Sequence, residues 1–135
     1  MSALLKPAMN GVYRLPSDPV LLRDLLPAAG ARDVDLRRVR SKRGLLAALA
    51  RALQFPETFG GNWDALADSL QDLSWLGSAG IVLHLRGYDR FLAAAPDAAA
   101  TLQVIVTEAA QFWRSRSRLF VVFTEGAGAP LPPPR

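Results

Sequence analysis

Carboxylates recur every fourth residue in one stretch of a chain that is otherwise basic. Residues 55–73, FPETFGGNWDALADSLQDL, contain no lysine or arginine but carry Glu57, Asp64, Asp68 and Asp72. On a helix, side chains four residues apart are neighbours, and like charges at that spacing repel by about 0.2–0.5 kcal/mol per pair. A row of carboxylates without basic residues to pair with them suits binding to a cationic partner outside the chain.

The predicted helix that carries this row has two faces. Its apolar residues fall within one arc of about 120°, a usual width for a face that packs on a core. They are Trp63, Leu66, Ala67, Leu70 and Leu73. The three aspartates lie on another side, within an arc of about 80°. Periodicity alone leaves two interpretations open, a solvated polar face or a binding surface, although the helix dipole by itself accounts for Asp64.

The elements around this helix alternate between strand and helix patterns, which predicts an α/β domain with a parallel sheet and right-handed crossovers. We expect strands at residues 12–15, 34–39, 81–85 and 119–123 and helices at 19–26, 42–53, 89–95 and 98–113. Ser41, Asn62 and Asp97 stand where each can cap the helix that follows, and Asp18 can cap the first helix. Residues 55–61 contain a proline and two glycines, which is typical of a loop.

Composition limits the classes of protein that the chain can belong to. With 135 residues, 50% hydrophobic and 21% charged, it is an ordinary globular chain of one domain. It has no cysteine, which excludes disulfides, thiolate nucleophiles and cysteine zinc sites and suits a reducing cytoplasm. The N-terminus lacks the apolar region of a secretory signal, and no apolar run is long enough to cross a bilayer.

Candidate catalytic groups are scarce. His84 is the one histidine and lies in an apolar run, so we interpret it as a structural residue, because no nucleophile or set of metal ligands accompanies it. Gly60 and Gly61 precede a helix, but that helix begins with an acid and no G-K-[ST] follows, so we predict a turn there, not a phosphate loop. We therefore predict neither an enzyme nor a cofactor or metal site.

The net charge of +4 comes from two basic clusters, and these support an alternative function. The first cluster contains Arg37, Arg38, Arg40, Lys42 and Arg43, and the second contains Arg114, Arg116 and Arg118. Such clusters can bind nucleic acid, and Phe112 and Trp113 could stack on bases, so a nucleic-acid or ribonucleoprotein binding module is the alternative. The first cluster follows a predicted strand and the second precedes one. In a parallel sheet they would lie at opposite ends, which argues against one continuous groove.

The run PETFGGNWDALADSL resembles the central signature of the barstar family, intracellular inhibitors of ribonucleases such as barnase. The resemblance covers about residues 33–124, and the helix before the run and the strand and helices after it agree with it. We accordingly divide the chain into an N-terminal strand and helix extension packed on the domain (1–32), a barstar-like domain (33–124) and a disordered tail rich in proline and glycine (125–135).

The resemblance implies a small parallel sheet packed between helices, with three strands and possibly a fourth from the extension. It also implies a bacterial, cytoplasmic protein that acts in a toxin–antitoxin-like immunity, is a monomer when free, and plugs the active site of a small basic ribonuclease. Asp68 would be the principal mimic of a substrate phosphate and Asp64 a second anionic contact. The residues expected to bind the partner are Thr58, Phe59, Gly60, Gly61, Asn62, Trp63, Asp64, Ala67, Asp68 and Glu108.

The chain departs from the family pattern at several places. Thr58 stands where the family usually has an aromatic residue, and Ala67 stands where it has a tryptophan. Both changes remove large side chains of the kind that dominate interface energies. A glutamate on the family's penultimate helix corresponds to Glu108 or Thr107, depending on which flank is aligned, and Glu108 is the chemically sensible choice.

Overall fold

Four parallel strands form the centre of the computed structural model, which describes residues 6–15, 31–73 and 80–125. The strand order across the sheet is β1-β4-β3-β2. In chain order the described elements are η1 (Pro7–Met9), β1 (Gly11–Arg14), β2 (Ala31–Asp35), α2 (Lys42–Ala52), α3 (Trp63–Leu70), β3 (Ile81–Arg86), α4 (Tyr88–Ala94), α5 (Pro96–Arg114) and β4 (Phe120–Thr124). The predicted α/β class and parallel sheet are confirmed, and β1 is the fourth strand.

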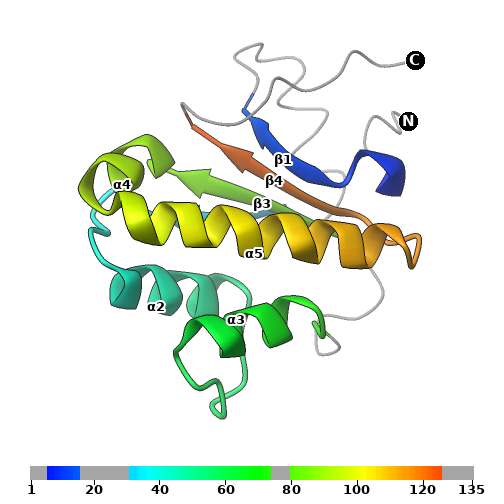
Figure 1. Cartoon of the computed structure of the whole chain (residues 1–135), viewed down its shortest axis with the longest axis horizontal. Coiled ribbons are helices and arrows are strands. Elements are labelled where there is room, and N and C mark those ends of the chain that lie inside the picture. The colour runs from blue at the N-terminus through cyan, green and yellow to red at the C-terminus, as the bar shows by residue number, and fades with distance from the viewer. Residues whose placement is uncertain (1–5, 16–30, 74–79, 126–135) are drawn as a thin grey trace.

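The described helices pack on one face of the sheet (Figure 1). Alternate residues of a strand point to opposite faces, and Leu83 and Val122, which are register partners, share one core cluster with Leu49, Leu66 and Leu102 of the helices. On the opposite face of the sheet, Val82, Val121 and Phe123 are also fully buried. Strands buried on both faces explain why β3 and β4 read as continuous apolar runs.

The edge strand β1 is joined to the sheet by a side chain as well as by its own backbone. Asn10 Oδ1 accepts a hydrogen bond from the Phe120 N–H at 2.8 Å, and its Nδ2 donates to the carbonyl oxygens of Ala110 and Arg118 at 3.1 and 2.7 Å. One residue therefore connects β1 to α5, to the turn after α5 and to β4. The helix predicted at 19–26 and the predicted tail beyond Glu125 lie outside the described residues.

Two of the predicted helix caps are confirmed and one is wrong. Ser41 Oγ accepts a hydrogen bond from the Gly44 N–H at 3.1 Å, and Asn62 Oδ1 accepts one from the Ala65 N–H at 2.7 Å. Asp97, in contrast, is not a cap, because α5 begins one residue earlier, at Pro96. Proline is favoured at the first helical position, since its missing N–H would have no partner there. Asp97 lies in the first turn, where the helix dipole favours an acid.

The predicted strand at 34–39 is also wrong in its bounds, since β2 covers Ala31–Asp35. The Asp35 carboxylate accepts a hydrogen bond from the Arg37 N–H at 3.0 Å, and the Val39 N–H donates to the Leu36 carbonyl at 3.1 Å. The chain therefore turns after residue 36, where the sequence pattern continued as a strand. The other described strands and helices agree with their predictions to within one residue, except α3 and the start of α5, which lies two residues earlier than predicted.

The helix α3 is shorter than the row of aspartates requires. It ends at Leu70, and Leu73 has a left-handed backbone with φ of 48° while its side chain remains buried. Asp72 therefore lies in the turn after the helix, and the prediction of three carboxylates on one helix is wrong for this residue. Among the described helices, none is long and apolar enough to cross a membrane.

Candidate functional site

The loop before α3 and the exposed side of α3 together form a shallow pocket of about 260 Å³. Its lining residues come from two segments, the loop at 56–60 and the helix and turn at 65–72. They are Pro56, Thr58, Phe59, Gly60, Ala65, Asp68, Ser69 and Asp72. Four residues predicted to bind the partner, Thr58, Phe59, Gly60 and Asp68, are thus brought together at one place.

Local interactions fix the shape of the loop. The Phe59 N–H donates to the Pro56 carbonyl at 2.9 Å, which closes a turn, and the rings of Phe55 and Phe59 pack with their centroids 4.8 Å apart. Gly61 has φ of 67°, a left-handed conformation that glycine adopts without strain, and Asn62 then caps α3. Gly61 and Asn62 therefore shape the loop and orient the helix, although neither lines the pocket.

Long-range contacts hold α3 against the rest of the domain. The Trp113 indole N–H of α5 donates to the Leu70 carbonyl at 2.7 Å, which satisfies one of the free carbonyls at the end of α3. At the other end, Lys42 Nζ of α2 lies 5.3 Å from the centroid of the Trp63 ring, within the range of a cation–π contact. Leu66 and Leu70 are fully buried. The carboxylates on the outer side of α3 are thus carried by an anchored helix.

The carboxylates of this surface have no ion-pair partner in the part of the chain that the structure describes. Among the described residues, Asp64, Asp68 and Asp72 form no ion pair, and all three are exposed. Asp64 lies in the first turn of α3, where the helix dipole stabilises an acid, but Asp68 lies in the last turn, where the dipole opposes one, and no basic residue is present there. The position of Asp68 is therefore unfavourable for the helix itself.

Four residues of the pocket were not in the predicted set, namely Pro56, Ala65, Ser69 and Asp72. Three of them follow from helical spacing, since Ala65, Asp68, Ser69 and Asp72 stand at i, i+3, i+4 and i+7. This spacing was visible in the sequence, but only the aspartates were used to predict the binding surface. Pro56 lines the pocket because it forms a turn with Phe59, and helical or strand periodicity does not predict such a turn.

The comparison with protein families agrees with this arrangement. The model of the family described as Barstar (barnase inhibitor) matches residues 30–125, which include β2, β3, β4, the helices α2 to α5 and the whole pocket. The chain belongs to the barstar family. A search of curated proteins found no match.

Within the barstar family pattern, the remaining predicted contacts are spread around the pocket. Trp63 and Ala67 are partly buried against the core, so each presents only part of its side chain. Thr107 and Glu108 are both exposed on α5, which packs against α3, and no described contact selects one of them over the other.

The two basic clusters lie at opposite ends of the sheet in this barstar-family fold. The first follows the carboxyl end of β2, and the second precedes the amino end of β4, which is parallel to it. In the second cluster, the Arg116 and Arg118 guanidinium carbons lie 3.6 and 4.8 Å from the ring centroids of Phe112 and Trp113. These aromatic faces are therefore occupied by arginine. Neither observation favours a continuous nucleic-acid groove.

His84 lies on the sheet face opposite the described helices and is 9% exposed. Its Nδ1 is 3.1 Å from Asp33 Oδ1 on β2. Its buried Nε2 is 3.4 Å from Glu125 Oε2 after β4 but makes no hydrogen bond to any described residue. The imidazole thus bridges the two strands beside β3, in keeping with a structural role. No group of three or more histidine or acidic residues suited to a metal ion occurs within the described part of the chain.

Proposed function

We propose that this protein inhibits a ribonuclease by binding it one to one and covering its active site with the loop at 56–60 and α3. The observation that carries the proposal is the pocket in which that loop meets Asp68 and Asp72, carboxylates with no cationic partner among the described residues. Membership of the barstar family supports the same partner class, because the family is described as the barnase inhibitor.

The chemistry of the partner explains why carboxylates would bind it. A site that cleaves RNA is cationic because it must hold phosphate groups, and a fixed surface of opposite charge accelerates encounter and selects the partner. Asp68 would replace a substrate phosphate against the cationic catalytic groups, and Asp64 would make a second anionic contact. Because α3 is held by Leu66, Leu70 and the bond from Trp113, little ordering is needed when the complex forms.

The remaining predicted residues would frame this contact. Thr58, Phe59 and Gly60 form the loop side of the pocket, and Trp63 and Ala67 lie beside it on α3. With Thr58 and Ala67 in place of large aromatic residues, the surface has fewer anchoring side chains, so the carboxylates supply a larger share of the affinity. Glu108 on α5 is the proposed contact outside the loop and α3.

Titration of a ribonuclease with the purified protein tests the proposal, and barnase is the first enzyme to use. We expect RNA cleavage to fall linearly with added protein and to stop at one equivalent, because a tight inhibitor acts stoichiometrically. A ribonuclease recovered from the protein's own cells on the immobilised chain provides the second enzyme. Failure to inhibit either enzyme at a large molar excess would show that the proposal is wrong.

A further inference from the structure

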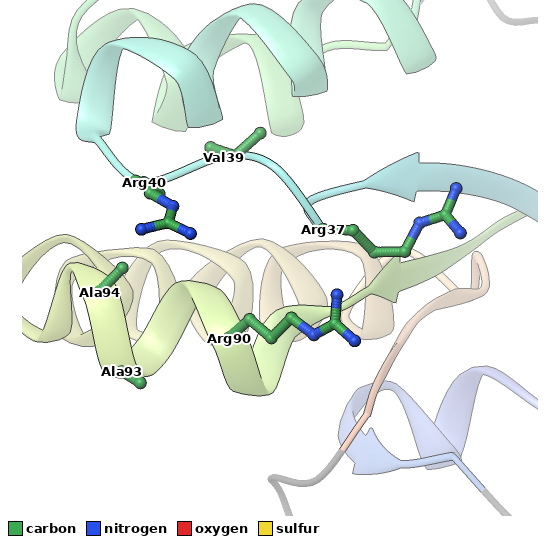
Figure 2. A pocket seen from close by; sticks show the side chains of 6 residues that line it. All are labelled: Arg37, Val39, Arg40, Arg90, Ala93 and Ala94. Atoms are coloured by element: carbon green, nitrogen blue, oxygen red, sulfur yellow. The ribbon is translucent and has the colours of Figure 1, made fainter.

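A second pocket lies at the carboxyl end of the sheet, between the loop that joins β2 to α2 and the helix α4. It has a volume of about 530 Å³ and is lined by Arg37, Val39, Arg40, Arg90, Ala93 and Ala94. Figure 2 shows the guanidinium groups of Arg37 and Arg90 on one side of the pocket and that of Arg40 on the other. No residue of this pocket belongs to the pocket beside α3.

The loop that carries two of these arginines is held in a defined shape. Gly87, just before α4, has φ of 71°, and a Cβ there would lie 2.7 Å from Arg37 Cγ and 2.9 Å from Arg37 Cα. The loop and the start of α4 therefore touch so closely that only glycine fits. The Leu36 N–H also donates to the Arg86 carbonyl at 2.8 Å, and the cap of Ser41 fixes the other end of the loop. The backbone on both sides of the pocket is thus fixed by contacts within the chain.

The charges around this pocket are not balanced. Arg37 makes a two-pronged ion pair with Asp35, with both distances 2.9 Å. Arg40 and Arg90 have no acidic partner among the described residues, although Asp89 is next to Arg90 in the chain. Two exposed guanidinium groups that form no ion pair within the described residues therefore line one pocket, from opposite sides.

We propose that this pocket binds a small molecule that carries a phosphate or diphosphate group, with Arg40 and Arg90 as its anion ligands. A guanidinium offers a planar fork of donors that matches two oxygens of a phosphate, and two such groups suit a doubly charged anion. The volume lies in the range of small-molecule sites, and Val39, Ala93 and Ala94 provide an apolar wall for the rest of the ligand. The inference does not depend on ribonuclease inhibition, because the two pockets share no residue.

A small ligand fits this site better than an RNA strand does. An RNA strand needs a basic groove that follows its backbone and exposed aromatic faces for its bases. Here the second basic cluster lies at the opposite end of the sheet, and Phe112 and Trp113 are covered by arginines.

Calorimetric titration of the full chain at about 0.15 M salt, where exposed charges are screened, tests the proposal. The probes are inorganic pyrophosphate, a nucleoside monophosphate, a nucleoside diphosphate and a short single-stranded RNA. We expect saturable binding of pyrophosphate or of a nucleotide at one site per chain. Comparison of their dissociation constants shows whether the ligand is a free inorganic phosphate or a nucleotide. Binding of RNA alone, or no saturable binding of any probe, would overturn the proposal.

Matched variants locate the site. Arg40→Gln with Arg90→Gln should weaken binding by at least about tenfold for each arginine, since each supplies a charged hydrogen bond. Arg43→Gln with Arg51→Gln removes the same charge from exposed positions of α2 that do not line the pocket and should leave the affinity unchanged. Equal weakening by both pairs would mean that net charge alone attracts the anion, and the site would be rejected. Unchanged thermal unfolding of both pairs establishes that they remain folded.

Discussion

The substitution Asp68→Ala tests whether the Asp68 carboxylate serves partner binding or the stability of the fold. We expect this change to leave the protein as stable as the parent or more stable, for reasons visible in α3. Removal of the carboxylate relieves repulsion from Asp64, worth about 0.2–0.5 kcal/mol. It also removes an acid from the last turn of the helix, worth about 0.3–1 kcal/mol, and introduces the best helix former. The free energy of unfolding should therefore rise by about 0–1.5 kcal/mol.

The effect on inhibition should have the opposite sign. Truncation of one member of a buried charge pair at an interface typically costs about 2–5 kcal/mol of binding, which corresponds to a loss of roughly 30- to 4,000-fold in affinity. The assay combines urea unfolding with the inhibition constant against barnase or the ribonuclease recovered from the native cells. If Asp68 mimics a phosphate, the variant should be at least as stable as the parent protein and should bind the ribonuclease far more weakly.

Two controls make this comparison decisive. Leu70→Ala truncates a fully buried side chain of the same helix and should cost about 2–5 kcal/mol of folding. Asp89→Ala removes one exposed carboxylate from α4, which Figure 1 shows on the far side of α5 from α3, and should change inhibition by less than about fivefold. If Asp68→Ala inhibits as well as the parent, the role assigned to Asp68 is wrong. If it unfolds the protein, the carboxylate belongs to the fold.

The remaining predictions concern the fold, the N-terminal extension and turnover. Asn10→Ala should lower the free energy of unfolding in urea by about 1–3 kcal/mol, because it leaves one N–H and two carbonyls without their partner; an unchanged midpoint would contradict this. Burial raises the pKa of Tyr13 and Tyr88 above 10.0. The unfolded chain then releases these protons first, so stability should hold below about pH 10 and fall as the pH rises further, and the folded protein should show less tyrosinate absorbance at pH 10 than the unfolded chain does. We expect the extension to be folded onto the domain, so limited proteolysis should not cut quickly between Arg14 and Arg23. The purified chain should leave RNA intact with or without divalent metals, and turnover that survives repurification would refute this.

The features that sequence analysis predicted correctly depend on neighbours in the chain. The Ser41 and Asn62 side chains each accept a hydrogen bond from the backbone N–H three residues later in the chain. The buried strands β3 and β4 are recognisable from their own apolar runs. The barstar-like run likewise lies within one loop and one helix. The bounds of β2 were missed because its exposed aspartates weaken the strand pattern and because Asp35 closes a turn with Arg37.

By itself, the sequence determined the class of fold, the family and the loop and helix that carry the carboxylates, since these follow from periodicity, capping and a continuous motif. Only the tertiary structure decided which distant residues meet. It places Asn10 against β4 and α5, His84 between two carboxylates, and Arg90 across from Arg40. Such contacts depend on strand order and on the close approach at Gly87, and these are set by packing of the whole domain, which no local pattern encodes.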